Sequence, residues 1–433
     1  MNVFIFTLGT RGDVQPYVAL GQGLLAAGHR VVVCTDSRFR SLITEHGLIA
    51  ADFNGLFTAL TNSSTGREVM ENAGTMWRQL GGLPKLLKLS EQMQRAVMDD
   101  GWRAAQASAP DIIVYHPKAF GGPHFAEKLK IPAAMAVPLP MLASTGEFPV
   151  VGFPRLPFGK RYNRGTYRVL HRLTRMITGK YVTSWRRTHG LPPMRRGQGS
   201  LQRTDGRPIP VLHGYSPLVG PVPADWPPQA EATGFWFLDP PADWQPIQSL
   251  VSFLEAGPPP VYVGFGSMTG NRARERAAMV IAALERAGVR GVMASGWGGL
   301  STDTCPPSVH LIDEVPHDWL FPRVSAVVHH GGAGTTAAGL RAGRPTVICP
   351  FMADQPFWGR CVHERGFGPA PIPQKKLTVG RLAAAIREAV SNPDTREKTE
   401  AVGRQLRAET GVQNAVQRLE AIVKSAPDRR TSL

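Results

Sequence analysis

The sequence of 433 residues contains no D-x-D pair, and none of its Gly-rich turns forms a G-x-x-x-x-G-K-[ST] loop or a clean G-x-G-x-x-G motif. Nearby carboxylates of the D-x-D kind usually hold the divalent cation of a metal-dependent nucleotide-sugar site. Their absence predicts a protein without a metal requirement. The missing glycine motif is the fingerprint of dinucleotide binding, so an oxidoreductase that uses a dinucleotide is poorly supported.

Cysteines and long apolar runs are also scarce. The four cysteines, Cys34, Cys305, Cys349 and Cys361, form no C-x-x-C pair, which is typical of reduced thiols in a cytosolic protein without a metal site. The longest apolar stretch, 131–143, holds three prolines and is too short to span a bilayer. The first apolar run, 3–8, has neither a basic n-region nor a cleavage site, so we expect a cytoplasmic location.

Acidic residues are outnumbered, with 33 Asp and Glu against 49 Lys and Arg and a net charge of +16. The imbalance is concentrated in 155–207, which holds fourteen basic residues and one acid, Asp205, and so contributes +13. One interpretation is a solvated basic surface on helices. Another is attraction to an anionic membrane or an acidic partner. Nucleic acid ranks below both, because no recognition motif accompanies the charge.

A chain of this length is too long for one ordinary core, so we expect two domains. Short β-rich runs alternate with helical stretches in both halves, which favours parallel sheets in doubly wound α/β domains. The expected strands are 3–8, 30–34, 111–115, 133–137, 260–265, 289–295, 309–312, 324–329 and 346–349. The expected helices are about 16–27, most of 64–109, 272–287 and about 411–424.

Domain boundaries follow from shifts in this pattern. We expect an N-terminal domain over 1–220 and a second domain over 247–410. The segment 221–246 is rich in Pro, Trp and Asp and has no steady period, so it is interpreted as a linker. The last segment, 411–433, is expected to form a helix that returns to the N-terminal domain.

The most specific motif is His-His-Gly-Gly-Ala-Gly-Thr-Thr at 329–336, with Asp354 and Gln355 about twenty residues later. The motif follows a β-branched run and opens a helical stretch. Such a turn presents backbone N–H groups and the positive helix end to an anion, and its glycines let a diphosphate approach closely. Asp354 and Gln355 follow the next strand and can bind sugar hydroxyls, so the pattern predicts a nucleotide-sugar site.

Two residues of the first half are candidates for proton transfer. Asp13 follows the first strand, where a carboxylate can take the proton of an acceptor hydroxyl. The alternative is an acid that only stabilises the start of a helix. His116 follows the strand 111–115 and is expected at the same edge of the sheet, where it can bond to Asp13 or to the acceptor. A histidine after a strand is more often structural.

Three segments resemble the family 1 glycosyltransferases of the two-domain GT-B fold, in the bacterial sterol-glucosyltransferase-like and glycopeptide-antibiotic branch. They are Gly-Thr-Arg-Gly-Asp-Val-Gln-Pro at 9–16, the pair Asp-Trp-Pro at 225–227 and Thr-Gly-Phe-Trp-Phe-Leu at 233–238, and the stretch from Val-Pro-His-Asp at 315–318 to Pro-Phe-Met-Ala-Asp-Gln-Pro at 350–356. The resemblance implies two Rossmann-like doubly wound domains facing across a cleft. It also implies inverting, metal-independent transfer of a sugar from a nucleotide-sugar to a hydroxyl.

The resemblance carries over site residues position by position. Asp13 matches the position of the acceptor base. Many relatives have His there and an Asp partner on a later strand, so this chain exchanges the two with Asp13 and His116. The donor-binding positions implied are Thr10, Arg11, Gly12, Ser267, Trp297, Val315, His330, Gly332, Gly334, Thr335, Asp354 and Gln355. Trp297 either stacks near the base or packs in the core.

The donor site departs from the plant pattern at three positions. Glu314 stands where plant enzymes have a base-stacking Trp, Ala338 stands in place of their ribose-binding Glu, and Gly334 replaces an Asn. UDP-glucose is the first choice of co-substrate, because Asp354 and Gln355 favour a sugar with free hydroxyls. A TDP-linked deoxysugar is the rival.

The N-terminal domain of such enzymes normally binds the acceptor. Its candidate apolar lining is Phe57, Met70, Met76, Trp77, Leu83, Met93, Phe120, Met141, Leu142 and Phe148, most of which are equally compatible with core packing. An apolar pocket suits a sterol, terpenoid, flavonoid or polyketide. The alternatives are a TDP-deoxysugar transferase of antibiotic biosynthesis, an epimerase or cell-wall precursor transferase of the same fold, and a non-catalytic nucleotide-sugar-binding protein. We expect a monomer or homodimer, with 155–207 as the candidate contact to an anionic membrane.

Overall fold

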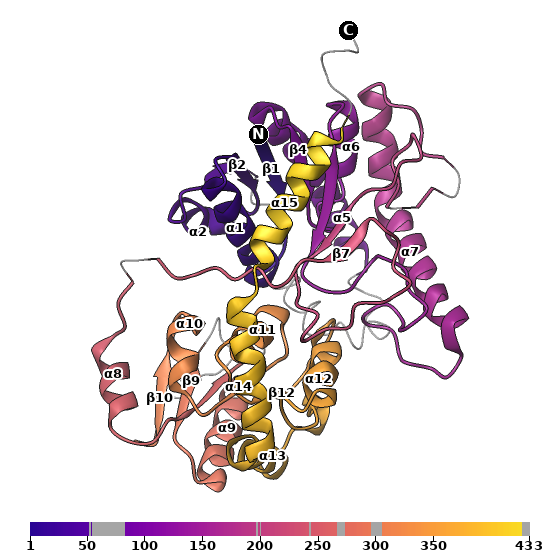
Figure 1. The fold of residues 1–433 in the computed structure, drawn as a ribbon. Helices are drawn as coiled ribbons and strands as arrows, with labels where there is room; N and C mark the ends of the chain where they lie inside the picture. The colour runs from indigo at the N-terminus through magenta and orange to yellow at the C-terminus, as the bar shows by residue number, and fades with distance from the viewer. Residues whose placement is uncertain are drawn as a thin grey trace. The chain divides into compact units, whose positions relative to one another are not determined.

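The computed structural model describes residues 1–51, 53, 83–195, 198–199, 201–241, 244–265, 273–295 and 305–426, with side chains of the helix that begins at 83 described from 91 onward. The chain forms two compact units (Figure 1). The first comprises Met1–Tyr215, Pro221–Leu238 and Thr410–Leu433, and the second Ser216–Gly220 and Asp239–Glu409.

The first unit is built on a seven-stranded sheet in the order β3-β2-β1-β4-β5-β6-β7, in which every neighbouring pair is parallel. Its strands are β1 (Asn2–Phe6), β2 (Arg30–Cys34), β3 (Ile49–Ala51), β4 (Ile112–Tyr115), β5 (Ala133–Val137), β6 (Val211–His213) and β7 (Ala230–Ala232). Its main helices are α1 (Arg11–Ala26), α2 (Arg40–Thr44), α5 (Leu83–Ser108), α6 (Gly122–Lys128), α7 (Gly159–Thr188) and α15 (Gly411–Lys424).

Alternate residues of these strands pack into two separate cores, because successive side chains of a strand point to opposite faces. Val3 and Ile5 of β1 lie in a core with residues of α1 and α15. Phe4 and Phe6 lie in the other core with residues of α5, α6 and α7. Both faces of the sheet are therefore covered, which explains why its strands read as continuous apolar runs.

The second unit repeats this plan on a five-stranded parallel sheet in the order β10-β9-β8-β11-β12. The strands are β8 (Val261–Gly264), β9 (Gly291–Ala294), β10 (Val309–Ile312), β11 (Ala326–His329) and β12 (Thr346–Ile348). The helices are α8 (Gln248–Glu255), α9 (Ala273–Ala287), α10 (His317–Leu320), α11 (Ala333–Arg341), α12 (Gln355–Glu364), α13 (Val379–Ser391) and α14 (Pro393–Ala408). The expected fold class, two α/β domains on parallel sheets, is confirmed.

The sequence-based expectation did not include strands β3, β6 and β7, and it misplaced the start of helix α1. Helix α1 begins at Arg11 rather than near Pro16, because Thr10 takes the N-cap position and Asp13 reaches back to its backbone N–H. Strand β7 lies within 221–246, where the sequence shows no steady period. The expected helical stretch 64–82 lies outside the described residues.

In the described part of the chain, no helix has the length and apolar character needed to cross a membrane. All four cysteines are free thiols, with Cys34, Cys349 and Cys361 buried and Cys305 exposed.

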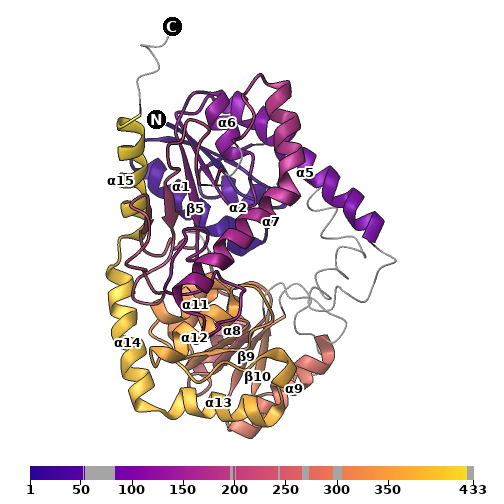
Figure 2. The same cartoon turned by 90° about the vertical axis from the view of Figure 1, so that its right-hand side faces the viewer.

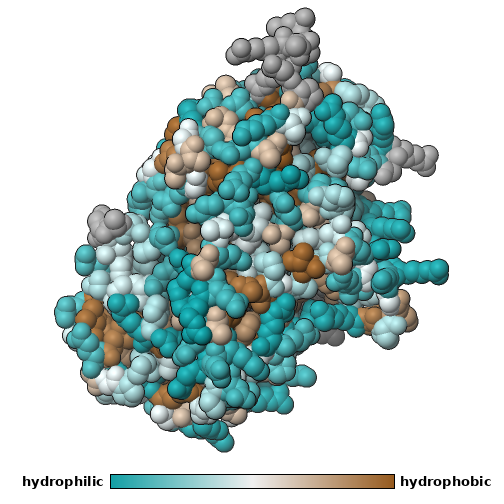
Figure 3. Space-filling view, viewed as in Figure 1, coloured by the Kyte–Doolittle hydropathy of each residue, from teal (hydrophilic) through white to brown (hydrophobic). Residues whose placement is uncertain are grey.

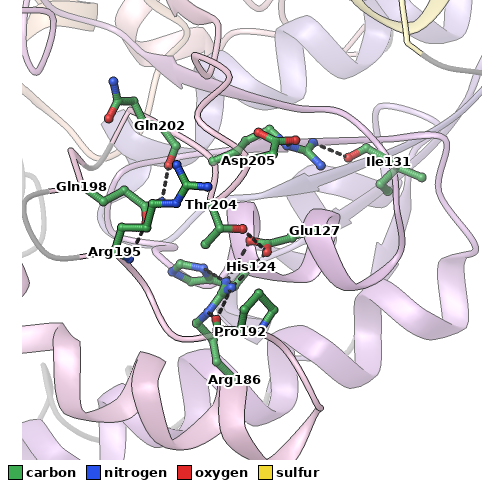
Figure 4. A network of polar contacts seen from close by, with 11 residues as sticks. His124, Glu127, Ile131, Arg186, Pro192, Arg195, Gln198, Gln202, Thr204 and Asp205 are labelled. Carbon is green, nitrogen blue, oxygen red and sulfur yellow. Dashed lines mark hydrogen bonds and ion pairs between the residues drawn. The ribbon is translucent and has the colours of Figure 1, made fainter.

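A buried ion pair anchors the C-terminal end of α7 to the first unit (Figure 4). The guanidinium of Arg186, only 1% exposed, donates to both oxygens of Glu127 on α6 at 2.8 and 2.9 Å. Arg186 also donates to the backbone carbonyl of Pro192 and contacts His124 Nδ1 at 3.1 Å. Glu127 accepts a further hydrogen bond from the Thr204 hydroxyl. This fully bonded arrangement fixes α7, α6 and the loop after α7 to one another.

Replacing one partner of this pair should be costly. Glu127→Gln leaves the buried guanidinium without a counter-charge, and we expect the free energy of unfolding in urea to fall by about 3–5 kcal/mol. The matched control is Glu91→Gln, which removes an exposed carboxylate from an ion pair with Arg95 and should leave the unfolding midpoint unchanged. Equal midpoints for the two variants would show that the Arg186 pair does not stabilise the fold.

Candidate active site

The carboxylate of Asp13 is held against the turn that joins β1 to α1. Its Oδ2 accepts hydrogen bonds from the Thr10 backbone N–H at 2.7 Å and from the Thr10 hydroxyl at 3.1 Å. The carboxylate lies so close to Gly9 that a Cβ at this position would sit 2.1 Å from Oδ2, and Gly9 has a φ of +143°. Only glycine therefore fits at position 9 without displacing the carboxylate.

His116 lies beside Asp13 because β4 is the immediate neighbour of β1 in the sheet. The His116 backbone N–H donates to the carbonyl of Phe6 at 2.9 Å, one residue beyond the paired end of β4. The buried ring places its Nε2 at 3.4 Å from Asp13 Oδ1. The structure thus brings together the two residues that the sequence proposed for proton transfer.

Hydrogen bonding fixes the form of the His116 ring. Its Nδ1 accepts from the backbone N–H of Lys118 at 3.1 Å, so the proton of the neutral ring sits on Nε2 and points toward Asp13. Burial lowers the pKa of His116 to about 4, an effect that Lys118 reinforces and the nearby Asp13 carboxylate only partly offsets. The ring is therefore neutral at pH 7.

Lys118 is a third member of the cluster, and our sequence analysis did not identify it. Its Nζ lies 2.8 Å from Asp13 Oδ2, with the lysine side chain 52% exposed and that of Asp13 18% exposed. Burial by itself would raise the pKa of Asp13, but the charge of Lys118, with smaller contributions from His116 and Thr10, lowers it below the ordinary value. The signal available in the sequence was its position two residues after His116 on the same strand-end loop.

A largely apolar cavity of about 220 Å³ adjoins this cluster in the first unit. Its lining comes from the end of β1, from α5, from the loop after β4 and from α7: Leu8, Met93, Gln94, Val97, Pro117, Lys118, Phe120, Thr174, Ile177 and Thr178. Because Lys118 both lines the cavity and contacts Asp13, a molecule in the cavity would lie next to the cluster of Asp13, His116 and Lys118.

The acceptor-binding candidates separate into three groups. Phe120 and Met93 line the cavity. Met141 and Phe148 are not among its lining residues: Met141 packs against the core beneath α5, α6 and α7, and Phe148 is buried. Phe57, Met76 and Trp77 lie outside the described residues, as do the donor candidates Ser267 and Trp297.

The remaining first-unit candidates surround the turn before α1. Thr10 is committed to Asp13, as described above. The exposed side chain of Arg11 donates to Gln15 Oε1 at 3.1 Å, four residues along the helix. Gly12 is exposed, and a Cβ there would meet nothing closer than 3.8 Å.

In the second unit, the loop after β11 turns sharply into α11. Gly331 has a φ of +96°, and a Cβ there would lie 2.7 Å from Ile348 Cγ2 and 3.1 Å from the Gln355 carbonyl. The buried ring of His329 accepts from the Gly331 N–H at 2.9 Å and holds the turn. Gly332 is the N-cap of α11, so the N–H groups of the first turn of α11 point along the helix axis without acceptors inside the helix.

His330 lies directly at this helix start. A Cβ on Gly332 would sit 2.7 Å from His330 Nε2, which places the imidazole over the N-cap residue. Burial lowers the pKa of His330 to about 4, so its ring is neutral at pH 7. Thr335 occupies the first turn of α11 and Gly334 is exposed there. Val315 lies before α10 and packs, partly buried, against the second unit's core.

Asp354 and Gln355 begin α12 beside this loop, since Gly331 approaches the Gln355 backbone. The Oε1 of buried Gln355 accepts from the N–H groups of Phe351 and Met352 at 2.7 and 3.1 Å. Asp354 Oδ2 accepts from Trp358 Nε1 at 3.0 Å. Both side chains therefore also hold the local structure, which the sequence pattern did not indicate.

In the part of the chain that the structure describes, no three or more His, Cys, Asp or Glu side chains form a cluster able to hold a metal ion.

Two glycines of the donor loop should respond differently to a methyl group. Gly331→Ala introduces strain at a positive φ together with a contact of 2.7 Å to Ile348 Cγ2, and we expect it to destabilise the second unit by about 1–3 kcal/mol. Gly334→Ala meets nothing within 4 Å, and lower backbone entropy in the unfolded chain should make it neutral or stabilising. Thermal unfolding of both variants compares them. A Gly331→Ala protein as stable as Gly334→Ala would contradict the strained turn.

Comparison with known proteins extends over nearly the whole chain. Residues 3–145 match the glycosyltransferase family 28 N-terminal domain, and residues 297–422 match the erythromycin biosynthesis protein CIII-like C-terminal domain. Sterol 3-beta-glucosyltransferase UGT80A2 of Arabidopsis thaliana is 35% identical over 100% of this chain and 67% of that protein. Sterol 3-beta-glucosyltransferase of Pichia angusta is 35% identical over 95% of this chain, which spans only 33% of that protein.

Solved structures share the fold over nearly the whole chain. The glycotransferase of kitacinnamycin aligns with a TM-score of 0.70 at 20% identity, covering 97% of this chain and 98% of that chain. Glycosyltransferase VinC in complex with dTDP aligns with a TM-score of 0.66 at 20% identity, covering 98% and 100%. These likenesses show the GT-B fold. With its two matched domains and its sterol-glucosyltransferase relatives, the chain belongs to the GT-B glycosyltransferases, in the group that includes the sterol 3-beta-glucosyltransferases.

Proposed function

We propose that this glycosyltransferase moves a sugar, with UDP-glucose as the first choice of donor, to a hydroxyl of a lipophilic acceptor such as a sterol, with inversion and without a metal ion. The observation that carries the proposal is the cluster of Asp13, His116 and Lys118 at the edge of an apolar cavity. An ionised carboxylate there can meet the polar end of a molecule whose apolar body occupies the cavity.

Asp13, rather than His116, is the base in this proposal. The neutral His116 ring directs its Nε2 proton toward Asp13, and its Nδ1 is occupied by the Lys118 N–H, so neither nitrogen is placed to take a proton. Asp13 Oδ2 already accepts from Thr10 and Lys118. The acceptor proton therefore goes to Oδ1, the oxygen with the longer contact, and His116 positions the carboxylate.

The reaction follows from this arrangement. The acceptor oxygen forms a bond to the anomeric carbon as its proton passes to Asp13, and the bond from that carbon to the diphosphate oxygen breaks. Attack from the side opposite the leaving group inverts the anomeric configuration. The diphosphate leaves with the bonding electron pair, and its negative charge requires stabilisation.

Groups of the second unit can supply that stabilisation. The N–H groups and positive end of α11 suit a diphosphate, with His330 and Thr335 beside them. Asp354 and Gln355 would bind the sugar hydroxyls. Because Gln355 Oε1 accepts two backbone hydrogen bonds, Gln355 would donate to the sugar through Nε2. Ser267 and Trp297 complete the proposed donor site, for the diphosphate and the base respectively.

Different observations bear on the acceptor and on the donor. The cavity lining is mostly apolar, and the relatives described above are sterol 3-beta-glucosyltransferases. A terpenoid, flavonoid or polyketide shares the required chemistry. The rival donor is a TDP-linked deoxysugar, because VinC, a neighbour in fold, was solved with dTDP.

Product analysis tests the proposal directly. Purified protein is given UDP-glucose or TDP-glucose with sterols, terpenoids, flavonoids and macrolides in the presence of EDTA, and adducts are measured by mass spectrometry. We expect a hexose adduct of a lipophilic hydroxyl compound from UDP-glucose. Asp13→Asn should lower kcat by about 10²–10⁴-fold, since it removes a general base but keeps the side-chain shape.

The matched control is Asp394→Asn, which removes an acid from the first turn of α14 and should leave kcat unchanged. Wild-type turnover in Asp13→Asn would exclude Asp13 as the base. Transfer from TDP-glucose but not from UDP-glucose would show that the donor is a TDP-sugar. Loss of transfer in EDTA would show that the reaction needs a metal ion.

The pH dependence of kcat/KM tests the electrostatics of the cluster. Asp13 must be ionised to accept a proton, so activity falls when pH drops below its pKa. Lys118 lowers that pKa, and Lys118→Gln should move the acid limb to higher pH. Lys130→Gln, an exposed change in the same unit, should leave the limb in place.

His116, with a pKa of about 4, should contribute no limb near its ordinary value of 6.5. A limb near pH 6.5 that His116→Asn abolishes would show that the histidine titrates during the reaction. An acid limb that Lys118→Gln leaves in place would show that Lys118 does not set the charge of Asp13.

A further inference from the structure

Helix α7 exposes two adjacent stripes of opposite character. Val169, Leu173, Met176 and Ile177 recur at helical spacing and are 46, 46, 71 and 57% exposed. Beside them runs a stripe of exposed arginines, also at helical spacing: Arg161, Arg164, Arg168, Arg172 and Arg175. At 100° per residue the two stripes lie next to each other on the helix surface. We call them the apolar stripe and the arginine stripe.

The charge of this helix has one sign. The segment 155–188 contains no Asp or Glu. Among the described residues, three acids of other elements pair with it: Asp225 with Arg164 at 2.8 Å, Glu91 with Lys180 at 3.6 Å, and Glu127 with the buried Arg186 at 2.8 Å. Figure 3 shows hydrophilic side chains projecting over α7, at the right-hand edge of the view. The positive face therefore persists after the ion pairs within the chain are counted.

The C-terminal turns of α7, which follow the two stripes, are firmly packed. Tyr181, Val182 and Trp185 belong to the core shared with α5 and α6, and Arg186 forms the buried pair with Glu127 (Figure 4). Helices α5 and α7 lie together on the same side of the first sheet (Figure 2). The two stripes are thus held in place by the fold, and exposing four large apolar side chains on such a helix needs an explanation beyond its packing.

The cavity described above opens beside the apolar stripe. Thr174, Ile177 and Thr178 of α7 form part of its lining, and Ile177 also belongs to the stripe. One side chain of α7 therefore borders both the exposed apolar surface and the cavity next to Lys118.

We propose that α7 docks on the surface of an anionic lipid bilayer. The apolar stripe enters the boundary between headgroups and acyl chains, and the arginine stripe contacts lipid phosphates and carboxylates, the arrangement of an interfacial amphipathic helix. A second copy of this chain is disfavoured because its arginines would face these arginines. Nucleic acid would satisfy the arginines but leaves the apolar stripe without a partner. Docking on the bilayer does not depend on the proposed reaction. Only the delivery of a lipophilic acceptor from the bilayer into the cavity depends on that reaction.

Vesicle sedimentation tests the docking without any assay of catalysis. The full chain is mixed with vesicles of phosphatidylcholine alone or of equal parts phosphatidylcholine and phosphatidylserine. We expect binding to the mixed vesicles that weakens as salt is added, because salt screens the charges. Arg168→Gln and Arg172→Gln should each weaken binding about fivefold. Leu173→Ser and Met176→Ser should weaken it further, since both remove apolar area from the bilayer.

Matched controls separate the stripes from general properties of the surface. Arg404→Gln removes an exposed arginine from α14, and Ile247→Ser removes an exposed apolar side chain before α8; both should bind as the unchanged chain does. Each variant is checked for an unchanged melting temperature. Absence of binding, equal binding to neutral vesicles, or stripe variants that bind like the controls would each overturn the proposal.

Discussion

The close contact between the Asp13 carboxylate and the backbone of Gly9 and Thr10 is the constraint on which the chemistry of the first unit depends. The carboxylate starts α1, since it accepts from the N-cap N–H, and it lies where the ends of β1 and β4 meet. The same oxygen atoms then face His116 and Lys118. The helix cap and the proposed proton acceptor are thus one group, so an interpretation of Asp13 as a structural acid and one as a catalytic base are compatible.

This double use limits the basicity of Asp13. The Asp13 carboxylate accepts hydrogen bonds from Thr10 and forms an ion pair with Lys118. Both contacts stabilise its charged form, so Asp13 is a weak base. Lys118 is half-exposed, however, and it lines the cavity, so it can leave the carboxylate when an acceptor enters. Under the proposed function, the lysine holds Asp13 ionised until the acceptor hydroxyl takes its place at the carboxylate.

In the second unit, the proposed diphosphate site is formed by the backbone more than by side chains. Its loop after β11 needs a left-handed residue, a close approach to Gln355 and uncovered N–H groups, and Gly331 and Gly332 provide these at successive positions. His329 accepts a hydrogen bond from the Gly331 N–H and so holds the turn, whereas His330 lies over the start of α11. Both units therefore place their polar groups at strand ends that open helices, which is where a parallel sheet gathers them.

The sequence predicted the features that depend on local pattern. Buried parallel strands produce apolar runs, so the strands of both sheets other than β3, β6 and β7 were predicted within a few residues. The family suggested by three motifs is confirmed by the relatives of the whole chain. Contacts between distant segments were harder to foresee. The sequence did not indicate that Lys118 contacts Asp13. It also did not indicate that the side-chain oxygen Oε1 of Gln355 accepts hydrogen bonds from two backbone N–H groups.

The basic segment 155–207 shows the same limit most clearly, because composition alone treats its fourteen charges as equivalent. The fold separates them. Arg186 is buried against Glu127, Arg203 and Arg207 lie at Asp205, and Arg164 is paired with Asp225. Among the charges that remain, Arg161, Arg168, Arg172 and Arg175 of the arginine stripe lie beside exposed apolar side chains. A net charge describes attraction at a distance, whereas this pairing of stripes selects a surface that is both anionic and apolar beneath, and a lipid bilayer has both properties.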